Sequence, residues 1–242
     1  MNFMRMNLRS MHKKTFEEIL EDIVGKYIGK SDKELCELFG REYNNNKAQW
    51  NDLAYKILGI RDEHADEFEK ANIKVKTIRI EENNKMRESM SFPPFKFADL
   101  VEEEYDDSTL HDYFDETRLF FFVWKKDGDV YRVKGCLLWN MPHADLEVTV
   151  RQEWEKYKHI IKYGVEFTKC IDSTGKLSYK NNLPNKSETE VIHVRPHATK
   201  AAYRFNNGEE YGNVERDANV LPNGEYMTTQ SFWINNSYIL KI

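Results

Sequence analysis

The sequence predicts a mixed α/β fold for this chain of 242 residues. Three observations support the prediction: helical periodicity near the N-terminus, strand periodicity in the middle, and one more helical stretch before a final region of short strands. Domains average ~100–200 residues, so we expect one domain over 1–242. Within it, residues 1–62 should form a helical N-terminal arm and residues 63–242 a sheet-containing core.

Three helices are expected in the N-terminal arm. In the first, apolar residues recur at helical spacing over 16–27. The second begins at Ser31, which forms the pattern of a capping box with Glu34, and it ends at Gly40. The third carries apolar residues at helical spacing over 50–58 and is followed by glycine, a common helix end.

The spacing of apolar residues then changes to that of strands. Residues 73–80 begin as strict alternation, which predicts a strand with one apolar face and one basic face. Residues 119–124 and 131–139 predict two more strands, joined by a hairpin turn at 125–129. A short strand is expected at 90–92, directly before two prolines.

The last part of the chain begins with an amphipathic helix. Its apolar positions run from Val150 to Ile161, and Gly164 is expected to end it. Beyond this helix, turn signals rich in Asn, Gly and Pro separate short segments, so we expect short strands and loops.

Composition excludes several classes of protein. Lys and Arg number 36 against 41 Asp and Glu, giving a net charge of −5, so a globally basic coat for non-specific nucleic-acid binding is excluded, although a local basic cleft is not. No run reaches the ~18 apolar residues of a membrane span, so no membrane partner is expected. The three cysteines are far apart and favour a reduced, cytoplasmic protein.

One segment is strongly acidic. From Phe97 to Thr117 there are nine acidic residues and no Lys or Arg. Such a block is usually a solvated face, and it is a poor surface for DNA. The alternative is a surface that binds another protein.

The strand at 73–80 carries the most informative chemistry. Many metal-dependent nucleases place one acid before a strand, then a second acid and a lysine separated by one residue, so that carboxylates hold Mg²⁺. Here the pattern is Glu67 followed by Lys74 and Lys76. Two ammonium groups on one strand face cannot hold Mg²⁺ but suit a phosphate. On spacing alone, an ordinary exposed basic strand face is the favoured interpretation.

Short segments spread over most of the chain resemble the MutH-type endonucleases. This family includes the mismatch-repair nickase MutH and the Sau-type restriction enzymes, all of which act at GATC. The matching segments, in the family's order, are Leu35–Gly40, Leu58–Gly59, Glu67–Ile78, Glu88–Phe92, Leu138–Pro142, Trp154–Glu155, His193–Ala198 and Ser231–Asn236. The resemblance implies a restriction-endonuclease-like fold with a central mixed sheet flanked by helices.

The chain is most similar to the second half of the two-domain Sau-type enzymes. In those enzymes the first half is catalytic, and the second lacks catalytic acids and binds another copy of the site as an effector. Glu67 matches the family's aspartate, Lys74 replaces its glutamate, and Lys76 retains its lysine. A further family glutamate falls near Tyr55. The resemblance therefore implies no catalytic residue and no metal in this chain, with Mg²⁺ needed only by the catalytic half.

The resemblance also implies a set of DNA-binding residues. Arg195 and Pro196 match the family's base-reading element, and His197 shares the side of Arg195 if that segment is extended. Arginine can bind guanine through two hydrogen bonds, worth ~1–3 kcal/mol of discrimination. An ion pair between Arg195 and the acidic block is the alternative. The other candidates are Glu88 at base edges, Lys47 in a groove, Trp233 near adenine, and Lys74, Lys76, Lys134 and Lys200 at phosphates.

Simpler roles remain open for three of these candidates. Glu88 could be a solvated turn residue, Lys47 an ordinary exposed loop lysine, and Trp233 a core side chain.

The implied function is sequence-specific binding of double-stranded DNA at GATC by a single MutH-like DNA-binding domain. The domain would be the allosteric effector of a cytoplasmic type II restriction endonuclease, and the catalytic MutH-like half of that enzyme would be its partner. One alternative is an active Mg²⁺-dependent GATC endonuclease that uses Glu67 and Lys76. The other is a protein-interaction module that binds through the acidic block.

Overall fold

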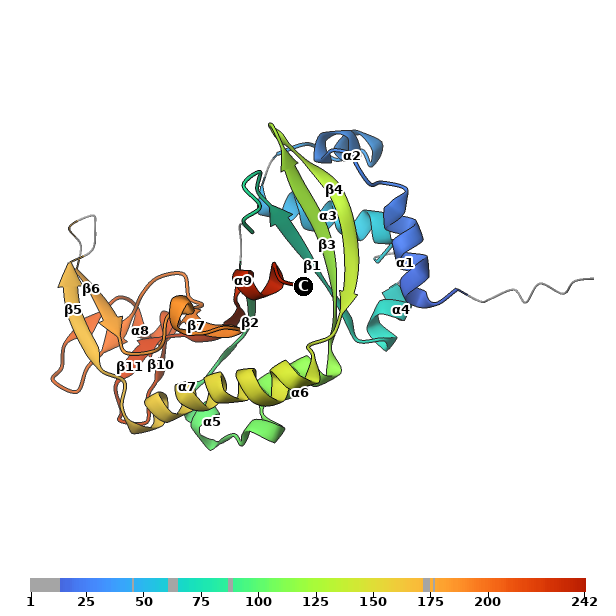
Figure 1. Ribbon diagram of the computed structural model, residues 1–242. Helices are drawn as coiled ribbons and strands as arrows, with labels where there is room; N and C mark the ends of the chain where they lie inside the picture. The colour runs from blue at the N-terminus through green and yellow to red at the C-terminus, as the bar shows by residue number, and fades with distance from the viewer. Residues whose placement is uncertain (1–13, 45, 61–64, 87–88, 172–174, 176) are drawn as a thin grey trace, which may run out of the picture. The chain divides into compact units, whose positions relative to one another are not determined.

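The computed structural model describes residues 14–44, 46–60, 65–86, 89–171, 175 and 177–242 (Figure 1). The chain divides into two compact units. The first unit contains Met1–Ile78 and Leu119–Trp139, and the second contains Arg79–Arg118 and Asn140–Ile242. Helices and strands occur in both units, which confirms the predicted mixed α/β class. The boundary expected at residue 62 falls inside the first unit, and the single functional domain stays a prediction.

The three predicted N-terminal helices are α1 (Phe16–Gly25), α2 (Asp32–Leu38) and α3 (Lys47–Leu58). Thr15 and Ser31 cap the first two through capping boxes, in which a glutamate three residues later bonds back to the cap. Gly59 ends α3 with a φ of 61°, a left-handed conformation that glycine adopts without steric cost. A short helix not predicted from the sequence, α4 (Ala65–Lys70), precedes the first strand.

A three-stranded sheet completes the first unit. It contains β1 (Ile73–Ile80), β3 (Arg118–Asp127) and β4 (Val130–Trp139) in the order β1-β3-β4. Strands β3 and β4 form the predicted hairpin, with Asp127 opposite Val130. The N-terminal helices share the hydrophobic core of this sheet. For example, the rings of Trp50 and Tyr131 pack edge to face, with their centroids 5.2 Å apart. They therefore belong to the core of the first unit, and their expected role as an arm stays a prediction.

A buried carboxylate links the helices of the first unit to its sheet. Asp32 is fully buried and accepts hydrogen bonds from Trp50 Nε1 (3.2 Å) and from the Tyr131 N–H (3.3 Å). Burial raises the pKa of this carboxyl, and the hydrogen bonds oppose that effect. Because every donor comes from an element of the same core, the arrangement fixes α2 against α3 and β4.

The second unit contains a three-stranded sheet in the order β2-β12-β7, formed by β2 (Met90–Phe95), β12 (Gln230–Ile234) and β7 (Ile192–Pro196). Both outer strands run antiparallel to β12. Strand β2 continues through Pro93 and Pro94, where the sequence predicted its end. An edge strand tolerates proline because one side of its backbone needs no ladder hydrogen bond, and the pairing shifts register between Ser231 and Trp233.

The other described strands of the second unit form two further sheets, so the strands that the structure describes are divided among several sheets rather than gathered in one central sheet. One has the order β10-β11-β8-β9, and the other pairs β5 with β6. Their bounds are β5 (Phe167–Ile171), β6 (Leu177–Asn181), β8 (Tyr203–Arg204), β9 (Glu210–Tyr211), β10 (Ala218–Val220) and β11 (Tyr226–Thr228). The predicted amphipathic helix is α7 (Arg151–Tyr163), which follows the π-helix η2 (Asp145–Val150) and ends at Gly164.

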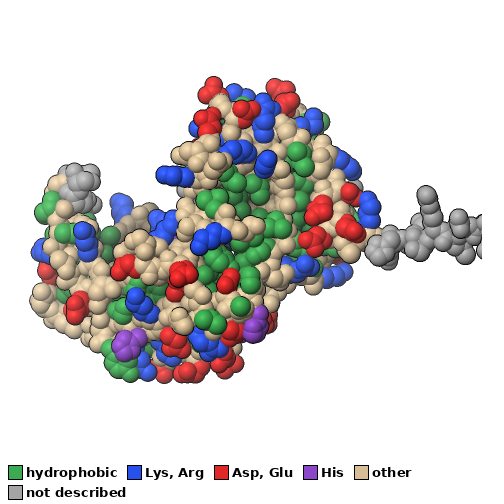
Figure 2. Space-filling model, viewed as in Figure 1, with side chains coloured by type: hydrophobic (Ala, Val, Ile, Leu, Met, Phe, Trp, Pro, Cys, Tyr) green, Lys and Arg blue, Asp and Glu red, His purple; other side chains and the backbone are tan. Residues whose placement is uncertain are grey.

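The acidic segment folds into α5 (Phe97–Glu102), η1 (Tyr105–Asp107) and α6 (Thr109–Glu116). Most of its apolar side chains are buried, whereas all its acidic residues except the half-buried Glu103 are exposed. Figure 2 shows the acidic side chains gathered over α5 and α6 at the lower rim of the view. The acidic side chains thus form an exposed face, as both the solvated face and the alternative of a protein-binding surface require.

The remaining helices of the second unit are short: η3 (Lys186–Glu188), α8 (Val214–Asp217) and α9 (Asn236–Ile239). Among the residues that the structure describes, no helix combines the length and apolar character that crossing a membrane requires.

Candidate functional site

A cleft of about 320 Å³ in the first unit brings together part of the predicted site. Its walls include Tyr55 of α3, Phe68 of α4, and Lys74 and Lys76 of β1. Glu67 lies on α4 beside Phe68, but its side chain is exposed and does not line the cleft. The structure thus places Tyr55, near which the resemblance put a family glutamate, in the same cleft as Lys74 and Lys76.

The electrostatics of this cleft favour an anion. Burial lowers the pKa of Lys76, and the positive charge of Lys74 lowers it further. The described residues that line the cleft include no carboxylate. A partly desolvated ammonium group beside a second cation is stabilised by a negative group such as a phosphate oxygen. A divalent cation, by contrast, needs oxygen ligands with negative charge.

The other predicted residues of the first unit are less informative. Lys47 is the first residue of α3, whose cap Asn46 accepts a hydrogen bond from the Gln49 N–H. Lys134 is exposed on β4. Glu88 lies outside the residues that the structure describes, so its predicted role stays a prediction.

A second group of predicted residues meets on strands β7 and β12 of the second unit. The Arg195 guanidinium lies over the ring of Trp233, 4.7 Å from its centroid. The His197 ring lies 6.1 Å from the same indole, and His197 Nδ1 is 2.9 Å from Ser231 Oγ. Arg195, Pro196 and His197 are exposed, and Trp233 is half-buried. Stacking on an aromatic face fixes the plane of a guanidinium and leaves its N–H edge for a ligand.

The alternative role of Arg195 as an ion-pair partner of the acidic block is not observed. Within the described part of the chain, Arg195 makes no ion pair with any carboxylate. Trp233 is half-buried rather than fully buried, and the Arg195 guanidinium lies over its ring.

The structure adds one cation that the sequence analysis missed. Lys186, at the start of η3, donates a hydrogen bond from Nζ to Asn236 Oδ1. Burial lowers the pKa of Lys186, and the charge of Arg195 lowers it further. Lys186 stands in an irregular, Asn-rich stretch without periodicity, so no sequence signal connected it with Arg195. Lys200, a predicted phosphate contact, is exposed in the same unit.

A buried histidine lies next to this surface. His193 is 3% exposed and lies opposite Trp233 in the β7–β12 register. Its Nδ1 lies 2.6 Å from Asn235 Oδ1, while Asn235 Nδ2 donates to the Thr189 carbonyl. Because the Asn235 oxygen is the acceptor, His193 carries its proton on Nδ1. Burial lowers the pKa of His193 to about 4, so the ring is neutral at pH 7.

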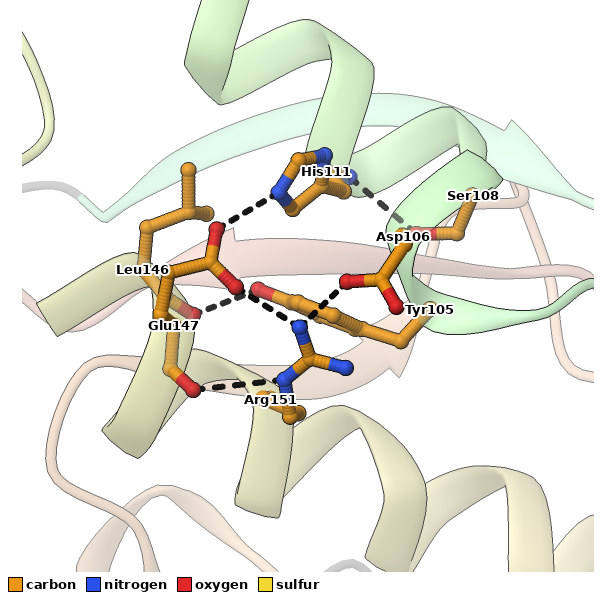
Figure 3. A network of polar contacts seen from close by, with 7 residues as sticks. All are labelled: Tyr105, Asp106, Ser108, His111, Leu146, Glu147 and Arg151. Atoms are coloured by element: carbon orange, nitrogen blue, oxygen red, sulfur yellow. Dashed lines mark hydrogen bonds and ion pairs between the residues drawn. The ribbon is translucent and has the colours of Figure 1, made fainter. Parts of the chain in front are cut away.

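A third cluster joins Asp106, His111 and Glu147, whose ligand atoms lie within 4.8 Å of one another (Figure 3). Arg151 Nη2 is ion-paired with both carboxylates, and His111 Nε2 lies 2.8 Å from Glu147 Oε1. The guanidinium thus stands between the two acids, where a metal ion would need them as ligands. The cluster instead braces the junction of η2 and α7, together with the hydrogen bond from Tyr105 Oη to the Leu146 carbonyl.

Comparison with known proteins gives an independent result. The chain is 33% identical to the type II restriction enzyme Sau3AI of Staphylococcus aureus over an alignment of 252 positions, which covers 94% of this chain. This chain is a relative of a type II restriction enzyme. The similarity confirms the resemblance recognised in the sequence and is consistent with a restriction-endonuclease-like fold.

The alignment covers different shares of the two proteins. The chain spans about half, 51%, of the length of the restriction enzyme, as expected for one half of a two-domain enzyme. No protein-family model matches the chain.

Proposed function

We propose that this chain binds double-stranded DNA containing GATC as the non-catalytic effector domain of a cytoplasmic type II restriction endonuclease. The catalytic MutH-like half of that enzyme is its partner, and Mg²⁺ is required by that half alone. Occupation of the effector site changes the activity of the catalytic half, which requires a coupling free energy between two distinct DNA sites. The 33% identity to a restriction enzyme about twice as long supports this proposal.

The observation that carries the proposal is the lysine cleft beside β1. A metal-dependent nuclease holds Mg²⁺ between carboxylates, which activate water and neutralise the phosphodiester. Here Lys74, Lys76 and Tyr55 line the cleft, and Glu67, exposed on α4, is not among the residues that line it. We infer that the two lysines hold a DNA phosphate directly and that the strand is not cut.

Sequence recognition is assigned to the surface of β7 and β12. Arg195 presents a planar donor edge held by the Trp233 ring, and guanine offers O6 and N7 as paired acceptors in the major groove. Lys186 and Lys200 add positive charge in the same unit. Phosphate contacts position a duplex without reading it, whereas a bidentate arginine discriminates between bases.

The test is a combined binding and cleavage assay. A labelled duplex with one GATC and a scrambled duplex of equal length and composition are titrated with the protein, with Mg²⁺ present and at two salt concentrations. Fluorescence anisotropy measures binding, and a denaturing gel measures cleavage of the same samples.

The three outcomes separate the candidate functions. Selective binding of the GATC duplex with intact DNA supports the effector domain. Cleavage at GATC contradicts it and favours the active nuclease with Glu67 and Lys76. Equal, weak binding of both duplexes contradicts site-specific recognition and favours a protein-interaction module.

A further inference from the structure

One glutamate of helix α7 supports the strand that carries Arg195. The Glu153 carboxylate accepts a hydrogen bond of 2.8 Å from the Ile192 N–H and bonds of 3.2 and 3.3 Å from the Val191 N–H. It also accepts one from the Glu190 N–H. Three consecutive backbone donors therefore converge on a single side chain at the point where β7 begins.

This geometry differs from that of a regular strand. Along an extended strand, successive N–H groups point to opposite sides, so three in a row cannot all face one acceptor. The Glu153 carboxylate thus fixes a local backbone concavity directly before β7, of the kind that binds anions. Val191 and Ile192 are 2% and 0% exposed, so donors left without an acceptor here would be buried at a large cost.

The opposite side of the same segment is held as well. The Val191 carbonyl accepts a hydrogen bond of 2.8 Å from the Asn235 N–H, just beyond the end of β12. The segment is thereby fixed between α7 and the β12 side of the sheet. From this point the register sets Ile192 opposite Ile234 and Arg195 opposite Ser231.

The position of Arg195 depends on this register. A slip of one residue would turn every side chain of β7 to the other face of the sheet and would separate Arg195 from Trp233. We propose that Glu153 is a positioning residue for base recognition: it holds the start of β7 so that Arg195 stays on the Trp233 ring, facing a base edge. This inference rests on the proposed function, and Glu153 itself touches no DNA.

The experiment compares variants in their discrimination between GATC and scrambled duplexes. Glu153→Ala removes the acceptor, and Glu155→Ala, at an exposed position on the same helix, is the matched control. Discrimination should fall ~10-fold in Glu153→Ala, the scale of one lost bidentate base contact, while binding of the scrambled duplex changes less than ~2-fold. Glu155→Ala should behave as wild type.

Two further variants separate positioning from general stability. Tyr105→Phe removes a buried hydrogen bond of 2.6 Å elsewhere in the unit, so it should lower the melting temperature and leave discrimination intact. In the double variant Glu153→Ala/Arg195→Ala, discrimination should be no lower than in Arg195→Ala alone, because both changes remove the same contact. Glu153→Gln keeps only one acceptor oxygen and sets an NH2 group, which cannot accept, against the other N–H donors. It should therefore lose part of the discrimination, and it replaces the alanine variant if that one does not fold.

The results distinguish failure of the inference from failure of the proposed function. If Arg195→Ala loses discrimination and folded Glu153→Ala or Glu153→Gln keeps it fully, the positioning role is overturned and the proposed function stands. If the wild-type chain does not discriminate, the proposed function and the inference both fail.

Discussion

The lysine cleft of the first unit and the arginine surface of the second unit hold their cationic side chains in different ways. In the cleft, Lys74 and Lys76 of β1 line one space beside Tyr55, and Lys76 is partly buried. On β7, one guanidinium is stacked on Trp233, and the start of its strand is held by Glu153. Point charges suit phosphates, whose positions carry no sequence information, whereas a fixed planar donor suits a base edge. We therefore expect the first region to supply mainly affinity for DNA and the second region to supply mainly sequence specificity.

The largest expected effect concerns the buried support of the second region. His193 has a pKa of about 4 in the folded chain and ~6.5 when unfolded. Between these values the unfolded state binds a proton that the folded state does not, so stability falls as the pH falls through this window. The loss should reach about 3 kcal/mol by pH 4. Urea unfolding at several pH values measures it.

The matched variant for this prediction is His193→Gln, which cannot titrate. Its free energy of unfolding should depend less steeply on pH between 6.5 and 4 than that of the wild type, although its packing also changes. Equal slopes for the two proteins would mean that His193 is not held neutral in the folded state.

The next largest effect is expected for Arg195→Ala. Loss of one bidentate arginine–guanine contact should reduce discrimination between GATC and scrambled duplexes by ~1–3 kcal/mol. Binding of the scrambled duplex should be lowered only slightly. Arg132→Ala is a suitable control, since Arg132 is bound to Asp127 at 2.7 Å. A similar loss in both variants would place specificity outside β7.

A smaller effect, of a different kind, is expected for Lys74→Ala/Lys76→Ala. Affinity for both duplexes should fall by the same factor, because phosphate contacts do not depend on sequence. The slope of log K against log salt should become less negative by ~2, about one unit for each lost contact. A loss confined to the GATC duplex would contradict the division between the two regions.

The smallest effect is expected on removing the metal. Since the cleft is lined by Lys74, Lys76 and Tyr55 rather than by carboxylates, GATC binding should change less than ~2-fold when EDTA replaces Mg²⁺ at matched ionic strength. A large, reversible loss of affinity in EDTA would indicate a metal held by other acids.

The spacing of apolar residues along the sequence predicted the elements of the first unit better than those of the second unit. The helices before β1, the capping box of Ser31 and the β3–β4 hairpin all depend on neighbours within a few residues, and all are present. The helix α4 and the exposed position of Glu67 on it were not predicted.

In the second region the decisive contacts join residues far apart in the sequence. Glu153 meets Ile192 across 39 positions, and the Lys186–Asn236 bond spans 50. In the π-helix η2, the Leu146 carbonyl accepts a hydrogen bond from Tyr105, 41 positions away. Strand β2 continues through its prolines because it lies at a sheet edge, a fact of topology that local sequence does not contain.

The central claim is that one region supplies affinity and the other supplies specificity. The most direct test measures the salt dependence of binding to GATC and scrambled duplexes for the wild type, Lys74→Ala/Lys76→Ala and Arg195→Ala. The lysine variant should shift both lines equally and flatten them, and the arginine variant should bring the two lines together with little change of slope. If the lysine variant abolishes discrimination while the arginine variant keeps it, the account is contradicted.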